Sequence, residues 1–269
     1  MSIGNKNNII RSKLNGSATI PTLKIAKLGI VSRDYNLKYE NKYRDFSYSL
    51  QGILKLLDQK GCDTVVFSLF SVVPRKSFNP YNCFKDLKNI KAILFEEFQD
   101  IGKRERGRYV VYYFSTHWDE YDFEQWFGTL AGTKENKILE FVHKELPKRV
   151  MGNCCVLLCG ETNGVKYSPK DKKVHDIFKL VESIPKKVNI ILNPIHDRMT
   201  RFEMKLKRQF LSENSRWAIS VWNKGKKDRN GKSKDGNGPA WAIFHNGKEL
   251  FATELENQLN VEIGIVDIV

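Results

Sequence analysis

The chain has 269 residues, of which 41% are hydrophobic and 28% charged, a composition that excludes wholesale disorder and allows one large α/β domain. No apolar run approaches the roughly 20 residues that a membrane helix needs, and the polar N-terminus lacks the apolar centre of a signal peptide, so we expect a cytoplasmic protein. The net charge of +14 favours contact with nucleic acid or another acidic partner, although a lysine-rich host composition gives the same surplus.

The first half of the chain is expected to alternate strands with helices after a loose lead-in over residues 1–22. One helix is well marked, because Phe46, Leu50, Ile53 and Leu57 fall on one helical face and Gly61 follows in the usual terminating role. The expected strands are 23–31, 63–70 and 108–114, and the expected helices are 41–60, 84–100, 120–128 and 134–146.

The second half begins with a strand at 153–159 and closes with a run of strands. The spacing of Val174, Ile177, Phe178 and Val181 predicts a helix between them. The other expected elements are strands at 188–192 and 217–222, a helix at 199–210, and closing strands near 239–245, 248–254 and 260–268. Repeated strand–helix units imply parallel strands with covering helices, and the closing strands add antiparallel pairs, so we expect a single α/β domain over residues 23–269.

One thiol stands where α/β enzymes present their reactive groups. Cys159 follows the apolar run Val156–Leu158 and precedes Gly160 and Glu161, which places it at the carboxyl end of a strand. Cys159 is therefore a candidate nucleophile. The alternative is that it is buried as a small apolar residue, as free cysteines often are. The five cysteines are odd in number and contain no CxxC pair, so neither a disulfide framework nor a zinc site is predicted.

Two residues are candidates for a base beside Cys159. Glu161 lies two residues from the thiol, and His117 follows the predicted strand 108–114; the alternatives are a turn cap for Glu161 and a passive role for His117. Asn193 and Asn223 are assigned to substrate binding, or to holding site loops through side-chain bonds to the backbone.

A basic loop over residues 224–236 carries six basic residues against two acidic ones and no apolar residue. It is either a phosphate-binding loop or a solvated insertion. The predicted nucleic-acid contacts are Lys224, Lys226, Lys227, Arg229, Lys232 and Lys234. No GxxxxGK, GxGxxG or HExxH motif occurs, so no nucleotide, dinucleotide or metal cofactor is expected.

The order of elements and the residues at their joints resemble the nitrilase, or carbon–nitrogen hydrolase, superfamily. The segments that carry the resemblance are Lys24–Ala26, Gly61–Phe67, Leu158–Glu161, Ile190–Pro194, Ser212–Ala218, Gly236–Ala242 and Asn246–Lys248. The resemblance implies a four-layer αββα sandwich that pairs into dimers. It also implies hydrolysis of amides or nitriles by a Cys nucleophile, a Glu base and a Lys that stabilises developing negative charge.

The resemblance places Cys159 as the nucleophile but puts Leu69 where the family has its Glu and Ser115 where it has its Lys. Two main hypotheses follow. The first is a divergent cysteine-dependent hydrolase of amide or nitrile carbon, in which Glu161 or His117 replaces the base. The second is an inactive nitrilase-fold protein that binds nucleic acid or an acidic partner. A weaker third is a Mg²⁺-dependent nuclease using acidic residues such as Asp63 and Glu161.

Overall fold

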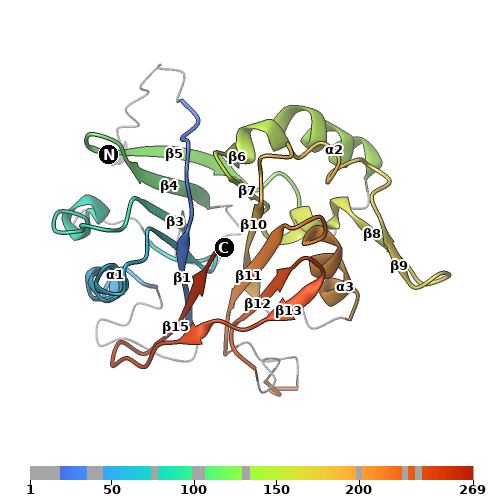
Figure 1. The fold of residues 1–269 in the computed structure, drawn as a ribbon. Helices are drawn as coiled ribbons and strands as arrows, with labels where there is room; N and C mark the ends of the chain where they lie inside the picture. Colours follow the sequence, from blue (N-terminus) through green and yellow to red (C-terminus); the bar gives the residue numbers. More distant parts are fainter. Residues whose placement is uncertain are drawn as a thin grey trace, which may run out of the picture.

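The computed structural model describes residues 19–34, 45–73, 78–98, 107–128, 134–197, 202–225, 230–233 and 238–268. Two β-sheets face each other across the centre of this structure, and helices lie against their outer sides (Figure 1). The first sheet has the order β14 (Thr253–Glu254), β15 (Val261–Asp267), β1 (Lys27–Arg33), β2 (Thr64–Phe67), β3 (Ala92–Glu97), β4 (Arg108–Phe114) and β5 (Trp118–Glu124).

The second sheet has the order β13 (Lys248–Leu250), β12 (Trp241–His245), β11 (Trp217–Asn223), β10 (Ile190–Asp197), β7 (Cys154–Val156) and β6 (Val150–Met151). Strands β1, β2 and β3 run parallel in the first sheet, as do β7, β10 and β11 in the second, while the outer strands pair antiparallel. A small hairpin of β8 (Lys166–Ser168) and β9 (Lys173–His175) stands apart from both sheets.

Three apolar clusters give the fold its four layers. The middle cluster lies between the sheets and joins residues such as Leu28 and Val66 to Val156, Leu192 and Ile219. A second cluster packs α1 (Leu50–Gln59) and the 3₁₀ helix η1 (Pro80–Cys83) on the outer side of the first sheet. A third covers the second sheet with α2 (Glu135–Glu140), the π-helix η3 (Phe141–Glu145) and the 3₁₀ helix η4 (Leu146–Arg149), and α3 (Phe202–Leu211) adds to that layer. The predicted αββα sandwich is confirmed.

Most predicted helices and strands form near their expected positions, but three segments predicted as helices do not. Within 84–100, the chain forms β3, because Ala92–Phe95 is buried on both faces as a central strand must be. Within 120–128, β5 forms instead, with Tyr121 and Phe123 inward and Asp122 and Glu124 exposed in strict alternation.

The third exception is the segment 174–181, where the apolar spacing is misleading. Val174 lies in β9, and Ile177 is 61% exposed rather than on a buried helical face. The Asp176 carboxylate accepts hydrogen bonds from the backbone N–H groups of Leu180 and Val181. Such side-chain bonds to the backbone compete with a helix and favour the turns that the structure has here.

Candidate functional site

Cys159 lies on a sharp elbow where β7 passes into the 3₁₀ helix η5 (Cys159–Gly164). Its φ of +33° is uncommon for a residue other than glycine, and such backbone outliers concentrate at functional positions. The elbow is braced from within, because the Leu158 N–H donates to Glu161 Oε2 at 2.8 Å and the Glu161 N–H donates to the Leu158 carbonyl at 2.8 Å. The Cys159 side chain is partly exposed, unlike those of Cys154 and Cys155 on β7, which are fully buried.

His196, on the neighbouring strand β10, contacts the Cys159 side chain. His196 lies near the end of β10, where the pairing with β11 shifts in register between Pro194 and Asp197. A bulge of this kind re-aims a side chain at the end of a strand. The His196 imidazole is hydrogen-bonded to the Cys159 side chain, and its own side chain is 21% exposed. The structure therefore joins Cys159 and His196 across the carboxyl ends of β7 and β10.

A carboxylate from the opposite sheet completes the group. Glu96 Oε2, on β3, lies 3.4 Å from His196 Nε2, and the Glu96 side chain is 7% exposed. The same oxygen accepts a hydrogen bond of 2.6 Å from the Phe70 N–H. Space for this carboxylate depends on Gly107, since a Cβ at that position would lie 2.6 Å from Glu96 Oε1. His196 and Glu96 thus come from strands of two different sheets, and Cys159 comes from the elbow that follows β7.

Phe70 supports the histidine from the side. Its ring centroid lies 4.0 Å from that of His196, and its φ of +57° is an outlier for a bulky residue. The backbone is clamped in this conformation, because the Phe70 carbonyl accepts a 2.7 Å hydrogen bond from Arg33 Nη2 while its N–H is bound to Glu96. The turn after β2 therefore places the Phe70 ring against the His196 imidazole.

The surroundings make His196 a strong base. Burial lowers its pKa, but the hydrogen bonds to Cys159 and Glu96 and the negative charge of both groups outweigh burial and raise the pKa from 6.5 to about 10. At neutral pH the imidazole is therefore a cation that lies between the Glu96 and Cys159 side chains. An adjacent imidazolium is an arrangement that favours the reactive thiolate form of a cysteine.

The raised pKa of His196 predicts how stability depends on pH. Because the folded state holds the proton more tightly than the unfolded chain, this contribution is complete below about pH 6.5 and is lost as pH rises towards 10. We expect His196→Gln to flatten the fall in unfolding free energy between pH 6.5 and 10, measured by urea unfolding at each pH. His143→Gln, at an exposed position, is the matched control and should leave the slope unchanged. An identical slope in wild type and His196→Gln would contradict the assignment.

Glu161, which the sequence suggested as a base, has a structural role. It is fully buried, and Oε1 accepts hydrogen bonds from Arg149 Nη2 at 3.0 Å and from the Trp126 N–H at 2.7 Å, while Oε2 holds Leu158. Burial raises the pKa of this carboxyl, and Arg149 and the two backbone donors oppose the rise. With both oxygens bound to the protein itself, Glu161 orients the cysteine elbow rather than taking a proton from a substrate.

His117 and Ser115 lie at the wrong end of the sheet for a role beside Cys159. Both are exposed in the turn between β4 and β5, next to the start of β3, where the Phe114 N–H donates to the Lys91 carbonyl. Glu96 lies at the other end of β3, opposite Tyr109, roughly four strand residues or about 13 Å away. The prediction for His117 and Ser115 is wrong because β3, which was predicted as a helix, lies between β2 and β4. Since β4 runs antiparallel to β3, the turn after β4 lies at the opposite end of the sheet from Glu96.

The two predicted substrate-binding asparagines bind the chain itself. Asn193 is buried; its amide donates to the Leu157 carbonyl at 2.6 Å and accepts from Ser220. The buried Asn223 amide donates to the carbonyls of Leu69 and His196 at 2.6 and 3.2 Å. These contacts fit the structural alternative for both residues, and Asn223 ties the turn after β2 to the strand that carries His196.

The basic loop is only partly described. Lys224 pairs with Glu262 and its N–H donates to the Arg33 carbonyl, so its charge is neutralised locally. Lys232 is exposed. The other predicted contacts, Lys226, Lys227, Arg229 and Lys234, lie outside the described residues.

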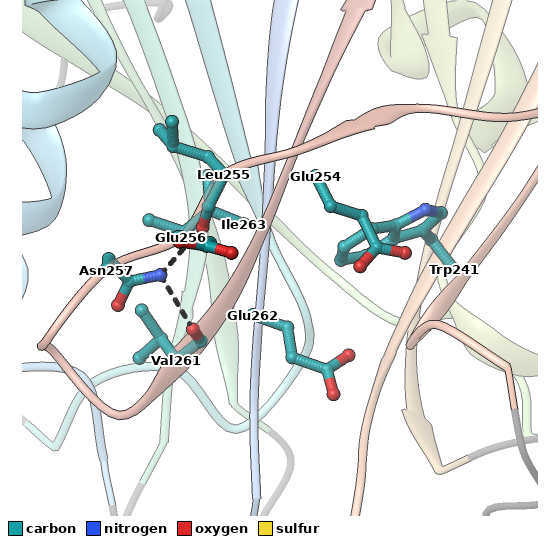
Figure 2. Close-up of a pocket in the computed structure, with 8 residues that line it drawn as sticks. All are labelled: Trp241, Glu254, Leu255, Glu256, Asn257, Val261, Glu262 and Ile263. Atoms are coloured by element: carbon teal, nitrogen blue, oxygen red, sulfur yellow. Dashed lines mark hydrogen bonds between the residues drawn. The ribbon is translucent and has the colours of Figure 1, made fainter.

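A hollow of about 420 Å³ lies at the edge where β12 faces β14 and β15, away from the cysteine elbow. Figure 2 shows its lining, in which the Asn257 amide bridges the carbonyls of Leu255 and Val261. Glu262 there accepts the Ala240 N–H as well as Lys224. Because the lining contains neither cysteine nor histidine and its polar groups brace the loop, we place the candidate chemistry at Cys159.

The described residues contain no helix long and apolar enough to cross a membrane. In the same ranges, no group of three or more His, Cys, Asp or Glu side chains is arranged to hold a metal ion.

No family model and no curated protein matches the chain. Among solved structures, a cysteine-to-serine variant of a Nesterenkonia amidase of the nitrilase superfamily is 12% identical, with a TM-score of 0.50 over 93% of each chain. A variant of an amidase from Nesterenkonia in complex with acrylamide is 10% identical, with a TM-score of 0.50 over 92% of this chain and 93% of that one. A carbon–nitrogen hydrolase from Helicobacter pylori is 12% identical at a TM-score of 0.47, covering 91% and 89%. The chain has the nitrilase fold.

At this level of identity the likeness shows the fold and leaves the chemistry to this chain's own residues. Leu69 is buried after β2, and its N–H donates to the Ile195 carbonyl at 3.3 Å, so no carboxylate stands at that position of the nitrilase fold. The carboxylate that does reach the site, Glu96, comes from the next strand, β3.

Proposed function

We propose that the protein is a cysteine-dependent hydrolase of an amide-type carbon–nitrogen bond. Cys159 is the nucleophile, His196 its proton-transfer partner, and Glu96 the group that orients and charges the imidazole. The observation that carries the proposal is the contact of His196 with both Cys159 and Glu96 at the strand ends of a nitrilase fold. A nucleophile, a base and an orienting third group within reach of one another are the signature of covalent catalysis.

The first half of the proposed reaction acylates the cysteine. The Cys159 thiolate attacks the carbonyl carbon of the substrate, and a C–S bond forms while the carbonyl electrons move onto oxygen. Collapse of this adduct breaks the C–N bond, and the departing amine takes the proton of the His196 imidazolium. The products are a thioester on Cys159, a free amine and a neutral His196.

The second half releases the acid. Neutral His196 takes a proton from water as the water oxygen attacks the thioester carbon. The C–S bond then breaks, the carboxylic acid leaves, and the thiolate–imidazolium pair is restored. Throughout, Glu96 accepts from the imidazole and stabilises its charged form, the role that the third group of such a triad plays.

This assignment differs from the Glu–Lys–Cys arrangement that the resemblance implies. Leu69 supplies no carboxylate, so the base comes from β10 as a histidine and the carboxylate from β3. The amide class of substrate rests on the two Nesterenkonia structures described as amidases, which share the fold.

The proposal is tested by trapping the acyl-enzyme. We expect wild-type protein, mixed with activated amides and esters of small acids, to gain the acyl mass on the Cys159 peptide. Cys159→Ala should gain none, whereas Cys83→Ala, which removes the only other cysteine that is not buried, should behave as wild type. The measurement is intact-protein and peptide mass spectrometry over time. Acylation that is equally fast in Cys159→Ala, or absent across the whole panel, would refute the proposed function.

A further inference from the structure

The hairpin β8–β9 projects from the body of the molecule on the side away from α1 (Figure 1). Over Lys166–Lys173 it carries four lysines against one aspartate, a net charge of 4 − 1 = +3. Lys170, Lys172 and Lys173 are all exposed at the turn. This hairpin is separate from the basic loop 224–236, and nothing in the proposed chemistry of Cys159 uses it.

Three of the four lysines of the hairpin, Lys170, Lys172 and Lys173, have no carboxylate partner among the described residues. The one carboxylate of the hairpin, Asp171, lies 2.7 Å from His175 Nε2 and also accepts the Lys173 N–H. Some lysines elsewhere have carboxylate partners, for example Lys27 with Asp267, Lys144 with Glu140, Lys148 with Glu145 and Lys205 with Glu249. Others in the described residues, such as the exposed Lys55 and Lys60 at α1, have no carboxylate partner. What distinguishes the hairpin is that three such lysines lie within four residues at one exposed turn.

The hairpin is built to hold these charges outward. Tyr167 pairs with Val174, whose side chain packs against the outer core, so that face of the ribbon is anchored. Side chains alternate along a strand, so Lys173 and its partner Ser168 point from the opposite face. At the turn, Lys172 has a φ of +58°, a conformation that glycine or asparagine adopts far more readily than lysine. The turn therefore places a lysine among other cations at the exposed tip of the hairpin.

We propose that the β8–β9 hairpin binds the phosphodiester backbone of a nucleic acid. Like charges crowded at a tip repel one another, and phosphates are the partner that relieves the repulsion while contacting several ammonium groups at once. The shape agrees, because a two-stranded ribbon is one of the two elements that fit the major groove of a duplex. Contacts from lysine to phosphate position a protein without reading sequence, so the binding is sequence-independent.

The test compares two triple variants of the full chain with equal net charge. K170Q/K172Q/K173Q removes the hairpin charges, and K55Q/K60Q/K85Q removes three exposed charges on and beside α1; each lowers the net charge from +14 to +11. Fluorescence anisotropy with a labelled 20-base-pair duplex and its single strand, from 50 to 200 mM salt, gives the affinity and its salt slope.

We expect the hairpin variant to bind about 10-fold or more weakly at 50 mM salt, with a slope shallower by up to about 0.9 per lost phosphate contact. The control should stay within about twofold of wild type. Tighter binding of the duplex supports insertion in the groove, and tighter binding of the single strand supports tracking of the backbone. Equal loss in both variants, a flat salt response, or binding to anionic phosphatidylserine vesicles without binding to either nucleic acid would overturn the proposal.

Discussion

Replacing His196 by glutamine should lower the reactivity of Cys159 at pH 6.5 by about 10-fold or more. An ordinary thiol with a pKa near 8.5 is roughly 1% thiolate at that pH, and an adjacent imidazolium favours the thiolate form of a cysteine. The lower intrinsic nucleophilicity of a thiolate stabilised in this way offsets part of the gain in ionisation. If the proposed hydrolase is active, turnover should also fall by about 10²- to 10⁴-fold, the usual contribution of a general acid–base group.

Glu96→Gln is the informative companion to this variant. Glutamine keeps an oxygen for the Phe70 N–H but removes the negative charge that holds the proton on His196. It should therefore shift the pH at which Cys159 reacts while changing the fold little. Phe70→Leu keeps an apolar side chain but removes the aromatic ring that packs against His196. Comparing it with Glu96→Gln separates the effect of charge on the reactivity of Cys159 from the effect of ring packing.

Replacing Arg149 by methionine should lower the free energy of unfolding by about 3–5 kcal/mol. Arg149 and Glu161 are both fully buried and lie 3.0 Å apart, and the guanidinium also lies 4.0 Å from the Phe123 ring centroid. Removing one partner leaves the Glu161 carboxylate in the interior without its counter-charge, next to the elbow that presents Cys159. Urea unfolding at pH 7 measures the loss.

Two controls make the result specific to the buried pair. Lys148→Met removes a neighbouring cation whose side chain is 55% exposed and whose surface pair should contribute less than about 1 kcal/mol. In the double variant Arg149→Met/Glu161→Gln no unpaired charge is left, so part of the stability should return. A loss for Arg149→Met no greater than that for Lys148→Met would show that the pair does not hold the elbow.

The architecture could be predicted from the sequence because apolar runs mark most of the central strands. The strand before Cys159, the strands β10 and β11, the final strands and helices α1 and α3 were predicted near their observed positions. The wrong secondary-structure predictions lie where the sequence pattern alone fits more than one structure and packing in the fold decides between them. Residues 92–95 are apolar on both faces, which allows either a buried strand or a buried helix.

The site was predictable at Cys159 and not at its partners. Glu96 was hidden inside the segment 84–100 that was predicted as a helix, so its place at the end of a central strand could not be seen. His196 follows Asn193 and Pro194, where the strand was expected to have ended, but β10 continues through a register shift to Asp197. A longer β10 would have placed His196 at the same sheet edge as Cys159, because the two strands are parallel neighbours.

The measurement that tests the Cys159–His196 pair most directly is the rate of Cys159 alkylation by iodoacetamide between pH 6 and 9, followed by peptide mass spectrometry in wild type and His196→Gln. Burial raises the pKa of Cys62 to about 11 and that of Cys155 to about 12, so those thiols should stay unlabelled in the folded protein. If Cys159 and His196 form a reactive pair, the wild-type rate persists well below pH 8, and the His196→Gln rate falls about tenfold per pH unit below pH 8. Superimposable profiles that both follow an ordinary thiol would contradict the Cys159–His196 pair.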